Sequence, residues 1–393
     1  MNYADFQRAV EDLPVYDTHT HLKGQQLAAS SVWDLAHYLW FVQELRAAGY
    51  PDPSIDLPDE QRFAALSQAL GRSANTTWSW AFKRIFADLY DVKVNGSVAT
   101  LRAADEAVRS SAQRNDWPSI VCDRIRLKRI VTNVEADAPY AQLPGVAVVM
   151  PRLEGVLREA RAKVAGASDQ RAAGAQVMDE LASRMGEIKS RGRTAVMTTY
   201  TLACPSDSVR SELPQHNNDD ATIGAFVLHA LAAACARHGL MLQLFLGIEH
   251  VAGNATAVNE CDRITNLYGL FARHACPFEL VTGGEVNNLD VVQACRIFPH
   301  VSAGALWWYN FRPSTYRQVM QYRFEGLPAV KSSLIASDAR QIEWAYGKIL
   351  VVKRLMAQYL FEQVQQGWCD AALALETARQ WLHDSAATRY GNR

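Results

Sequence analysis

The sequence predicts an α/β protein folded as a (β/α)8 TIM barrel, with a helical insertion after the first strand and a helical C-terminus. Three observations predict this fold. Eight short apolar runs are followed by helical patterns, which indicates repeated strand-then-helix units and a parallel sheet. About a hundred residues, mostly helical in pattern, separate the first run from the second. Residues 342–390 are also largely helical in pattern.

The eight predicted strands are all short. They lie at residues 15–16, 129–131, 146–149, 194–197, 241–246, 278–281, 300–303 and 333–336. A closed barrel accounts for eight strands separated by helices better than an open sheet does. One intervening helix is expected at residues 223–238, where Gly239 provides a natural C-terminal stop. His229 and His238 on this helix do not share a face, and both are expected at the surface.

The long first connection is interpreted as a mainly helical insertion at residues 24–125, expected to lie over the barrel mouth. Its clearest helical patterns cover residues 33–48 and 77–89, and a Pro-rich loop lies at residues 50–53. Barrels of this class absorb insertions and often exceed about 250 residues as one domain. Residues 1–393 are therefore predicted to form a single domain.

Charge and motif content argue against several classes of function. The 40 basic and 41 acidic side chains give a net charge of −1, which provides no field to attract nucleic acid or an anionic membrane. The sequence contains no G-x-G-x-x-G, G-K-[ST] or G-x-S-x-G motif, which argues against nucleotide-dependent enzymes and serine hydrolases. A small-molecule substrate is the expected partner, with neither nucleic acid nor a membrane. The sequence is compatible with a homo-oligomer and does not determine the oligomeric state.

Cysteine usage and the N-terminus indicate the compartment. The seven cysteines are dispersed and form no C-x-x-C pair, which favours buried thiols in a reducing compartment. The first residues show no basic segment followed by an apolar run, as a signal peptide would. No stretch approaches the ~18 uninterrupted apolar residues of a membrane span. The sequence thus predicts a soluble cytoplasmic protein.

The sharpest local motif is the run DTHTH at residues 17–21, directly after the first apolar strand. Residues two apart on a strand point to the same side, so His19 and His21 converge on one point. At the C-terminal end of a barrel strand that point lies in the active-site mouth. Imidazole is the commonest protein ligand for zinc and related ions, so the pair predicts a divalent metal site. The alternative is a chance H-x-H on a strand.

A third ligand is expected at the end of the eighth predicted strand. Asp338 lies there in the run SDAR, and a closed barrel brings this strand beside the first. Asp338 could bind the metal or accept a proton. Arg340 would present a planar fork suited to a substrate carboxylate. The alternative for Asp338 is a helix N-cap.

These motifs together resemble the amidohydrolase superfamily, and more specifically the uronate isomerase (glucuronate isomerase) family. Besides DTHTH and SDAR, the similar segments are HYLW at 37–40, AAG at 47–49, WSWAFKRIF at 78–86, GALWWYN at 304–310 and AATRYG at 386–391. The similarity is therefore spread over most of the chain.

The resemblance implies a metal, with zinc as the expected ion, held by His19, His21 and Asp338. It also implies interconversion of aldo- and keto-hexuronates, with Asp338 as the residue that moves the proton. The side chains that it assigns to the substrate pocket are Arg340, Trp307 and Trp308.

Several positions depart from the family pattern. The family carries a histidine at strand five, where this chain has Phe245, which cannot bind a metal. His250, just beyond, is a tentative substitute ligand, with a solvated loop histidine as the alternative. Arg152 is expected to bind substrate from a position shifted relative to the family's arginine after strand three. An Arg-His pair of the family corresponds to residues 348–349, which are Lys and Ile.

The leading functional prediction is a metal-dependent aldose–ketose isomerase acting on a hexuronate or a related sugar acid. The first alternative is a metal-dependent hydrolase of an amide, ester or lactone, because the same three ligands would activate water. The second alternative is a degraded barrel with a binding role, which predicts no stoichiometric metal. At the departing positions this chain lacks polar side chains that the family places in its substrate pocket. A pocket built to hydrogen-bond a polar substrate binds it much less well when such side chains are missing, so the sequence indicates a divergent relative.

Overall fold

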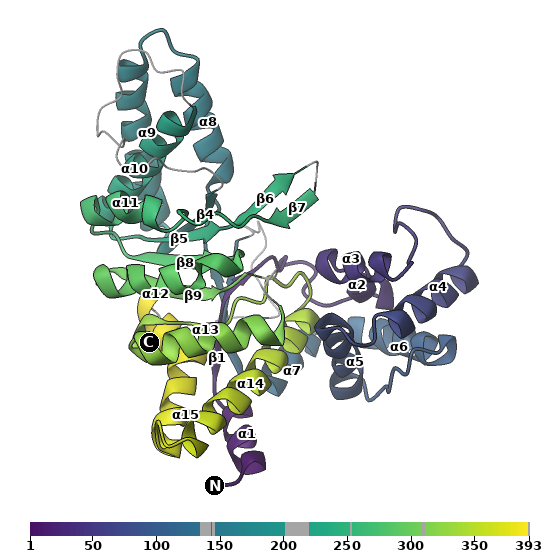
Figure 1. Cartoon of the computed structure of the whole chain (residues 1–393). Helices are drawn as coiled ribbons and strands as arrows, with labels where there is room; N and C mark the ends of the chain where they lie inside the picture. Colours follow the sequence, from purple (N-terminus) through teal and green to yellow (C-terminus); the bar gives the residue numbers. More distant parts are fainter. Residues whose placement is uncertain (134–142, 144–145, 201–219, 252–253, 308–310, 392–393) are drawn as a thin grey trace.

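The computed structural model describes residues 1–133, 143, 146–200, 220–251, 254–307 and 311–391 (Figure 1). Seven parallel strands form two sheets, one in the order β1-β2-β3 and one in the order β4-β5-β8-β9. Their bounds are β1 Val15–Thr20, β2 Leu127–Thr132, β3 Ala147–Val149, β4 Ala195–Tyr200, β5 Met241–Leu246, β8 Phe278–Thr282 and β9 Val301–Leu306. The first seven predicted strands are thereby confirmed.

The two sheets meet at residues that follow β3. Arg152 forms an isolated parallel bridge with Met197 of β4. The backbone N–H of Met197 donates to the carbonyl of Pro151 at 3.0 Å, and the N–H of Leu153 donates to the carbonyl of Met197 at 2.9 Å. Backbone hydrogen bonds therefore join β3 to β4 although the ladder is short.

The eighth predicted strand, at residues 333–336, is an extended segment rather than a regular strand. Ser333 N donates to Ala303 O of β9 at 3.0 Å, and Thr18 N of β1 donates to Ile335 O at 3.0 Å, so the segment lies between β9 and β1. It does not form a regular ladder because some of its N–H groups have other acceptors. Leu334 N, for example, donates to the carbonyl of Trp381 near the C-terminus at 2.9 Å. The TIM barrel is completed by this segment.

The elements between β1 and β2 are helices within the described residues. They are α2 Val32–Ala36, α3 Leu39–Ala47, α4 Asp59–Arg72, α5 Thr77–Leu89, α6 Val98–Ala112 and α7 Trp117–Arg124. The predicted helix at 33–48 is two helices, because Tyr38 takes a non-helical backbone (φ −55°, ψ 127°) between them. In Figure 1 the helices α4 to α6 extend to the right of the strands. Within the predicted insertion, Gln26 and residues 38–40 at the start of α3 line the cavity described below. The placement of the insertion over the barrel mouth stays a prediction.

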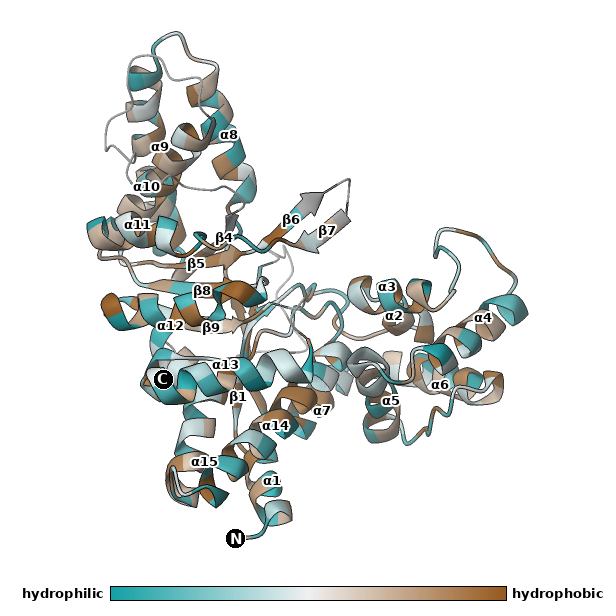
Figure 2. Ribbon diagram, in the orientation of Figure 1, coloured by the Kyte–Doolittle hydropathy of each residue, from teal (hydrophilic) through white to brown (hydrophobic). Residues whose placement is uncertain are grey.

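The remaining elements surround the strands. They are α1 Tyr3–Glu11, α8 Glu154–Ala165, α9 Gln170–Ser190, α10 Asp220–His238, the antiparallel hairpin β6 Ile248–Val251 and β7 Asn254–Ala257, α11 Tyr268–Arg273, α12 Asn288–Ile297, α13 Pro313–Gly326, α14 Ile342–Gln365, α15 Ala371–Arg379 and α16 Ser385–Arg389. The C-terminal part from α14 onward is helical, as predicted. Figure 2 shows strands β4, β5 and β8 as largely hydrophobic and the surrounding helices as mixed in hydropathy, which is the pattern of a barrel covered by amphipathic helices.

Helix α10 is the most apolar of the long described helices. Residues 221–238 have a mean hydropathy of 1.2, so length and composition alone would allow a membrane span, but 67% of this segment is buried inside the protein. The helix packs on α9, α8 and β5 as a core helix. His229 lies on it and is only 7% exposed, so its predicted surface position is wrong. An apolar helix that packs on several sides also buries a polar side chain that lies between its neighbours.

Candidate metal centre and its cavity

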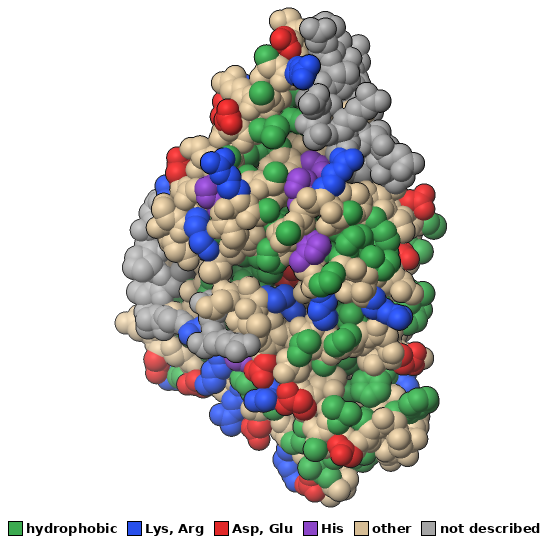
Figure 3. All heavy atoms as spheres, turned by 90° about the vertical axis from the view of Figure 1, so that its left-hand side faces the viewer, with side chains coloured by type: hydrophobic (Ala, Val, Ile, Leu, Met, Phe, Trp, Pro, Cys, Tyr) green, Lys and Arg blue, Asp and Glu red, His purple; other side chains and the backbone are tan. Residues whose placement is uncertain are grey.

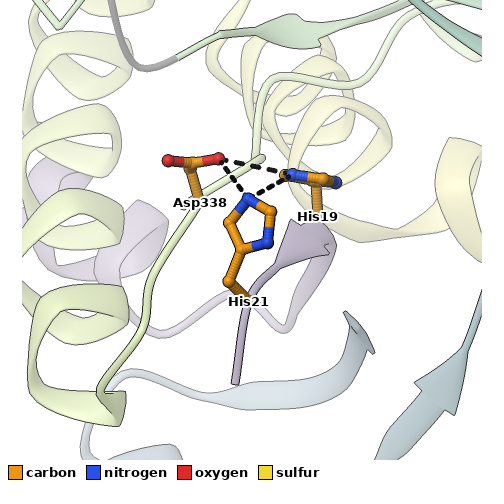
Figure 4. Close-up of side chains that lie close together, drawn as sticks. All are labelled: His19, His21 and Asp338. Atoms are coloured by element: carbon orange, nitrogen blue, oxygen red, sulfur yellow. Dashed lines mark hydrogen bonds and ion pairs between the residues drawn. The ribbon is translucent and has the colours of Figure 1, made fainter. Parts of the chain in front are cut away.

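Three candidate ligands converge at the C-terminal end of β1 (Figure 4). Nε2 of His19 and Nε2 of His21 lie 3.4 Å apart. Oδ1 of Asp338 lies 3.3 Å from the first nitrogen and 3.2 Å from the second. The alternating geometry of β1 and the path of residues 332–338 beside it produce this arrangement. The three residues that the sequence analysis proposed as ligands are thus brought together.

The donor set fits a divalent ion. Ligands of a tetrahedral zinc ion at about 2.0–2.1 Å lie roughly 3.3–3.4 Å from one another, which matches the three distances found here. A neutral imidazole nitrogen and a carboxylate oxygen are both electron-pair donors, so three of them directed at one point require a cation or protons between them. Two imidazoles and one carboxylate leave a fourth position for water or substrate.

Electrostatics favour the metal-binding protonation states. Burial lowers the pKa of His19 to about 4, so its imidazole is neutral near pH 7. Burial alone would raise the pKa of Asp338, but the adjoining His21 and His19 and the more distant Lys348 hold it well below its ordinary value. The neutral imidazole of His19 and the ionised carboxylate of Asp338, the forms that bind an ion, therefore predominate at neutral pH.

Asp17, the first residue of the DTHTH run, holds the two ligand-bearing segments together. Its carboxylate is fully buried and accepts hydrogen bonds from the backbone N–H of Ser337 at 2.9 Å, from the Ser337 hydroxyl and from the backbone N–H of His19 at 3.3 Å. The segment then turns sharply, since Asp338 has a left-handed backbone (φ 54°). Asp17 is thus a positioning residue that fixes where Asp338 meets the histidines.

Three side chains that the sequence analysis did not propose support Asp338 from behind. Trp40 Nε1 donates to Asp338 Oδ2 at 3.2 Å, and the Tyr38 hydroxyl is 3.3 Å from the same oxygen and donates to the Asp338 carbonyl at 2.7 Å. Buried Lys348 donates to the Tyr38 hydroxyl at 2.7 Å and to the carbonyl of Ser337. No motif or spacing marks these residues as a group, because they come from the insertion and from α14.

The strand-five side of the centre is apolar. Phe245 is fully buried, and its ring centroid is 4.4 Å from that of His19 and 4.8 Å from that of Trp307. The position from which a strand-five histidine would point at the metal is therefore occupied by an aromatic ring that packs on the ligand. His250 lies in β6, and its side chain is outside the described part of the structure, so its role as a substitute ligand stays a prediction.

The centre opens into a cavity of about 950 Å³. His21, Asp338, Arg340, Arg152 and Trp307 all line it, so these proposed site residues share one space. Arg152 Nε is 2.8 Å from Glu154, which also accepts from Thr199 N and Oγ1 at 3.0 and 2.8 Å. Trp308 lies outside the described residues.

The described cavity lining includes further cations that the sequence analysis did not single out. Lys23, Arg158 and Arg161 lie on its wall, the two arginines on helix α8. Their i, i+3 spacing places the arginines on one helix face, but such spacing is common on solvated helices, so it could not have marked a site in the sequence.

Comparison with known proteins identifies the fold. No family model matches the sequence, and no curated protein matches it. Among solved structures, the uronate isomerase of Thermotoga maritima superposes with a TM-score of 0.82 at 14% identity, covering 99% of this chain and 97% of that one. The chain has the uronate isomerase fold.

Two further structures agree. The glucuronate isomerase of Caulobacter crescentus has a TM-score of 0.78 at 15% identity, covering 99% of this chain and 93% of that one. A Lactobacillus casei protein, named as a metal-dependent hydrolase, has a TM-score of 0.61 at 13% identity and covers 98% of this chain and 97% of that one. Identities this low show the shared fold, and the chemistry must be argued from the site.

Proposed function

We propose that this protein is a metal-dependent aldose–ketose isomerase acting on a hexuronate or related sugar acid. The observation that carries the proposal is the convergence of His19, His21 and Asp338 at the mouth of a cavity that also contains Arg340. A structure similar to uronate isomerases over its whole length supports the same chemistry. The cavity volume of about 950 Å³ is of the size that binds a small molecule.

His19, His21 and Asp338 would hold the ion, for which zinc is our proposal. When bound, the ion would polarise the substrate carbonyl as a Lewis acid. Arg340, two residues beyond Asp338, would bind the substrate carboxylate through its planar guanidinium. Trp307 would form an apolar wall beside the sugar, because it packs on Phe245 next to the centre.

Isomerisation moves a hydrogen from C2 to C1 and a hydroxyl proton from O2 to O1. Asp338 is the proposed proton carrier, and Oδ2, the oxygen turned away from the histidines, is the atom that would accept and return the proton. Tyr38 and Trp40 contact this oxygen and fix the plane of the carboxylate. Lys348 holds the Tyr38 hydroxyl in place through a 2.7 Å hydrogen bond.

A hydrolase is the second candidate, and the similarity to the Lactobacillus casei structure supports it. In that reaction the same ligands would hold an ion that activates water, with Asp338 as the base. A degraded barrel with a binding role is the third candidate. We also propose a cytoplasmic location, which the free thiols of the six described cysteines support.

Incubation of the metal-loaded protein with glucuronate and galacturonate in D2O, followed by NMR, tests the proposal. We expect ketose signals with solvent deuterium at the carbon beside the carbonyl, and no such signals with the His19→Ala/His21→Ala double variant. A cleaved bond in an ester or lactone panel without isomerisation would establish the hydrolase instead. Less than about half an equivalent of metal after purification without chelator would favour the degraded barrel over both enzymes.

A further inference from the structure

The charge of the cavity exceeds what a single substrate carboxylate requires. Five cationic and two acidic side chains lie on its described wall, although the whole chain has a net charge of −1. They are Lys23, Arg152, Arg158, Arg161 and Arg340 against Glu154 and Asp338. Glu154 forms an ion pair with Arg152, and Asp338 is assigned above to the bound ion. The described part of the cavity wall therefore carries more positive than negative side chains.

The face of the molecule drawn in Figure 3 shows no comparable concentration of basic side chains among the described residues. Figure 3 shows the side of the molecule that lies on the left in Figure 1. On that face the described Lys and Arg side chains are interspersed with Asp, Glu and hydrophobic side chains, without a continuous basic patch. A local excess of one charge inside a concave site concentrates small ions of opposite charge.

Helix α8 contributes a cationic stripe to the wall. Glu154, Leu157, Arg158 and Arg161 follow an i, i+3, i+4, i+7 pattern and all line the cavity, so they form the face of α8 directed into it. A rise of 1.5 Å per residue places Arg158 and Arg161 about 6 and 10 Å further along the helix axis than Glu154. Arg158 forms no ion pair or side-chain hydrogen bond with any described residue.

The stripe is well separated from Arg340. Helix α8 follows β3, whereas Arg340 follows the segment of residues 332–338, and around the barrel β1 and β2 lie between this segment and β3. Arg340 forms no ion pair or hydrogen bond within the described chain either. The cavity thus presents cations at two distinct positions, one beside Asp338 and one on α8.

We infer that the ligand of this cavity carries two separated anionic groups: a carboxylate bound at Arg340 and a second anion, a phosphate ester or a second carboxylate, bound by the α8 stripe at Arg158 and Arg161. This inference rests on the proposed function for the carboxylate end. Two guanidinium groups one helical turn apart suit an anion with several acceptor oxygens, and a phosphate offers more of these than a carboxylate.

Isothermal titration calorimetry on the full, metal-loaded chain tests the inference with three open-chain six-carbon probes. Gluconate carries one carboxylate, glucarate carries two, and 6-phosphogluconate carries a carboxylate and a phosphate. Because hydrogen bonds between charged groups are roughly twice as strong as neutral ones, we expect at least one dianion to bind about 10-fold or more tightly than gluconate. A preference for 6-phosphogluconate identifies the second anion as phosphate, and a preference for glucarate identifies a carboxylate.

Matched variants assign this preference to the stripe. Arg158→Gln, alone and combined with Arg161→Gln, is expected to abolish the preference for the dianion and to change gluconate affinity less than about 2-fold. Arg184→Gln removes one positive charge from exposed helix α9 outside the cavity lining and should leave the three affinities unchanged. Far-UV circular dichroism and the melting temperature of each variant check folding, and the single variant suffices if the double variant unfolds.

Equal affinity for the three probes in the unmodified protein would overturn the inference, as would a dianion preference that survives Arg158→Gln. Both results are independent of the isomerase assay, because binding is measured with compounds that need not react. Isomerisation of simple uronates without a dianion preference would refute only the second anion site. A dianion preference without isomerisation would refute only the proposed reaction.

Discussion

Two pairs of histidines in the described part of the chain have ring nitrogens that approach closely, and the pairs differ in what surrounds them. His19 and His21 direct two Nε2 atoms at each other at 3.4 Å and at Asp338, beside an open cavity. His229 on α10 and His274 after α11 lie 3.0 Å apart, Nδ1 to Nε2, with rings edge to face. No Asp or Glu of the described chain completes this second pair as a ligand group.

The contrast shows what distinguishes a metal site from a hydrogen-bonded pair. In the second pair one neutral imidazole donates and the other accepts, so the two rings satisfy each other. In the first pair a carboxylate oxygen joins the two nitrogens, and three electron-pair donors cannot satisfy one another. Proximity of histidines is therefore insufficient, and the converging carboxylate is what indicates an ion.

The largest expected effect comes from removing the first pair. His19→Ala combined with His21→Ala should reduce bound metal from about one equivalent to background, because two of three ligands are lost. His229→Ala combined with His274→Ala is the matched control and should keep the metal. Inductively coupled plasma mass spectrometry of protein purified without chelator measures both. Metal retained in the first variant, or lost in the second, would show that the centre has been placed at the wrong histidines.

The next effect comes from the carboxylate that distinguishes the pairs. Asp338→Asn preserves size and an acceptor for Tyr38 and Trp40 but removes the charge. Loss of a ligand should weaken metal binding on the order of 100-fold, at least as much as loss of an outer hydrogen-bond partner. Competition with a chromophoric chelator gives the dissociation constant. An affinity within a few-fold of the unmodified protein would mean that Asp338 is not a ligand.

Sequence reasoning found the first pair but placed His229, one member of the second pair, at the surface, and the reason is physical. A strand places His19 and His21 on one side by a fixed two-residue period, and a closed barrel makes the eighth segment adjacent to the first, so Asp338 could be named as their partner. His229 and His274 lie 45 residues apart on different elements, and only tertiary packing brings them together.

The same limit applies to the supporting residues. Tyr38 and Trp40 donate to Asp338 from about three hundred residues earlier in the chain. Lys348 donates to the neighbouring Ser337 carbonyl from α14, and no sequence period relates the three side chains. Their segments were recognised only through the family resemblance. The eighth strand was placed correctly but is irregular, because the Leu334 N–H donates to the carbonyl of Trp381 instead of to a neighbouring strand. The local sequence could not show that this N–H group has an acceptor outside the sheet.

A smaller effect tests the support of Asp338. Trp40→Phe keeps an aromatic ring but removes the Nε1–H that donates to Asp338 Oδ2 at 3.2 Å. Loss of such an outer hydrogen bond should weaken metal binding by about 10-fold. Trp33→Phe, on neighbouring α2 and outside the cavity lining, is the control and should leave affinity unchanged. Equal metal affinity in the two variants would assign Trp40 a packing role only.

The smallest expected effect is on stability and belongs to the second pair. Burial, together with neighbouring His274 and Arg273, lowers the pKa of His229 to about 3, against 6.5 in an unfolded chain. Below pH 6.5 the unfolded state therefore binds more protons than the folded state, so this pair makes the free energy of unfolding fall as pH decreases from 6.5 toward 3.

His229→Gln should remove that dependence. Between pH 7.5 and 5.0 the unmodified protein should lose about 2 kcal/mol more stability than the variant, as measured by urea unfolding at both pH values. His238→Gln on the same helix is the control and should follow the unmodified protein. Because the metal centre is present in all three proteins, its own acid sensitivity cancels in the comparison. Equal losses of unfolding free energy in the unmodified protein and in His229→Gln would mean that the second pair takes up a proton within the folded state. The two neutral imidazoles would then not satisfy each other in the way that their geometry indicates.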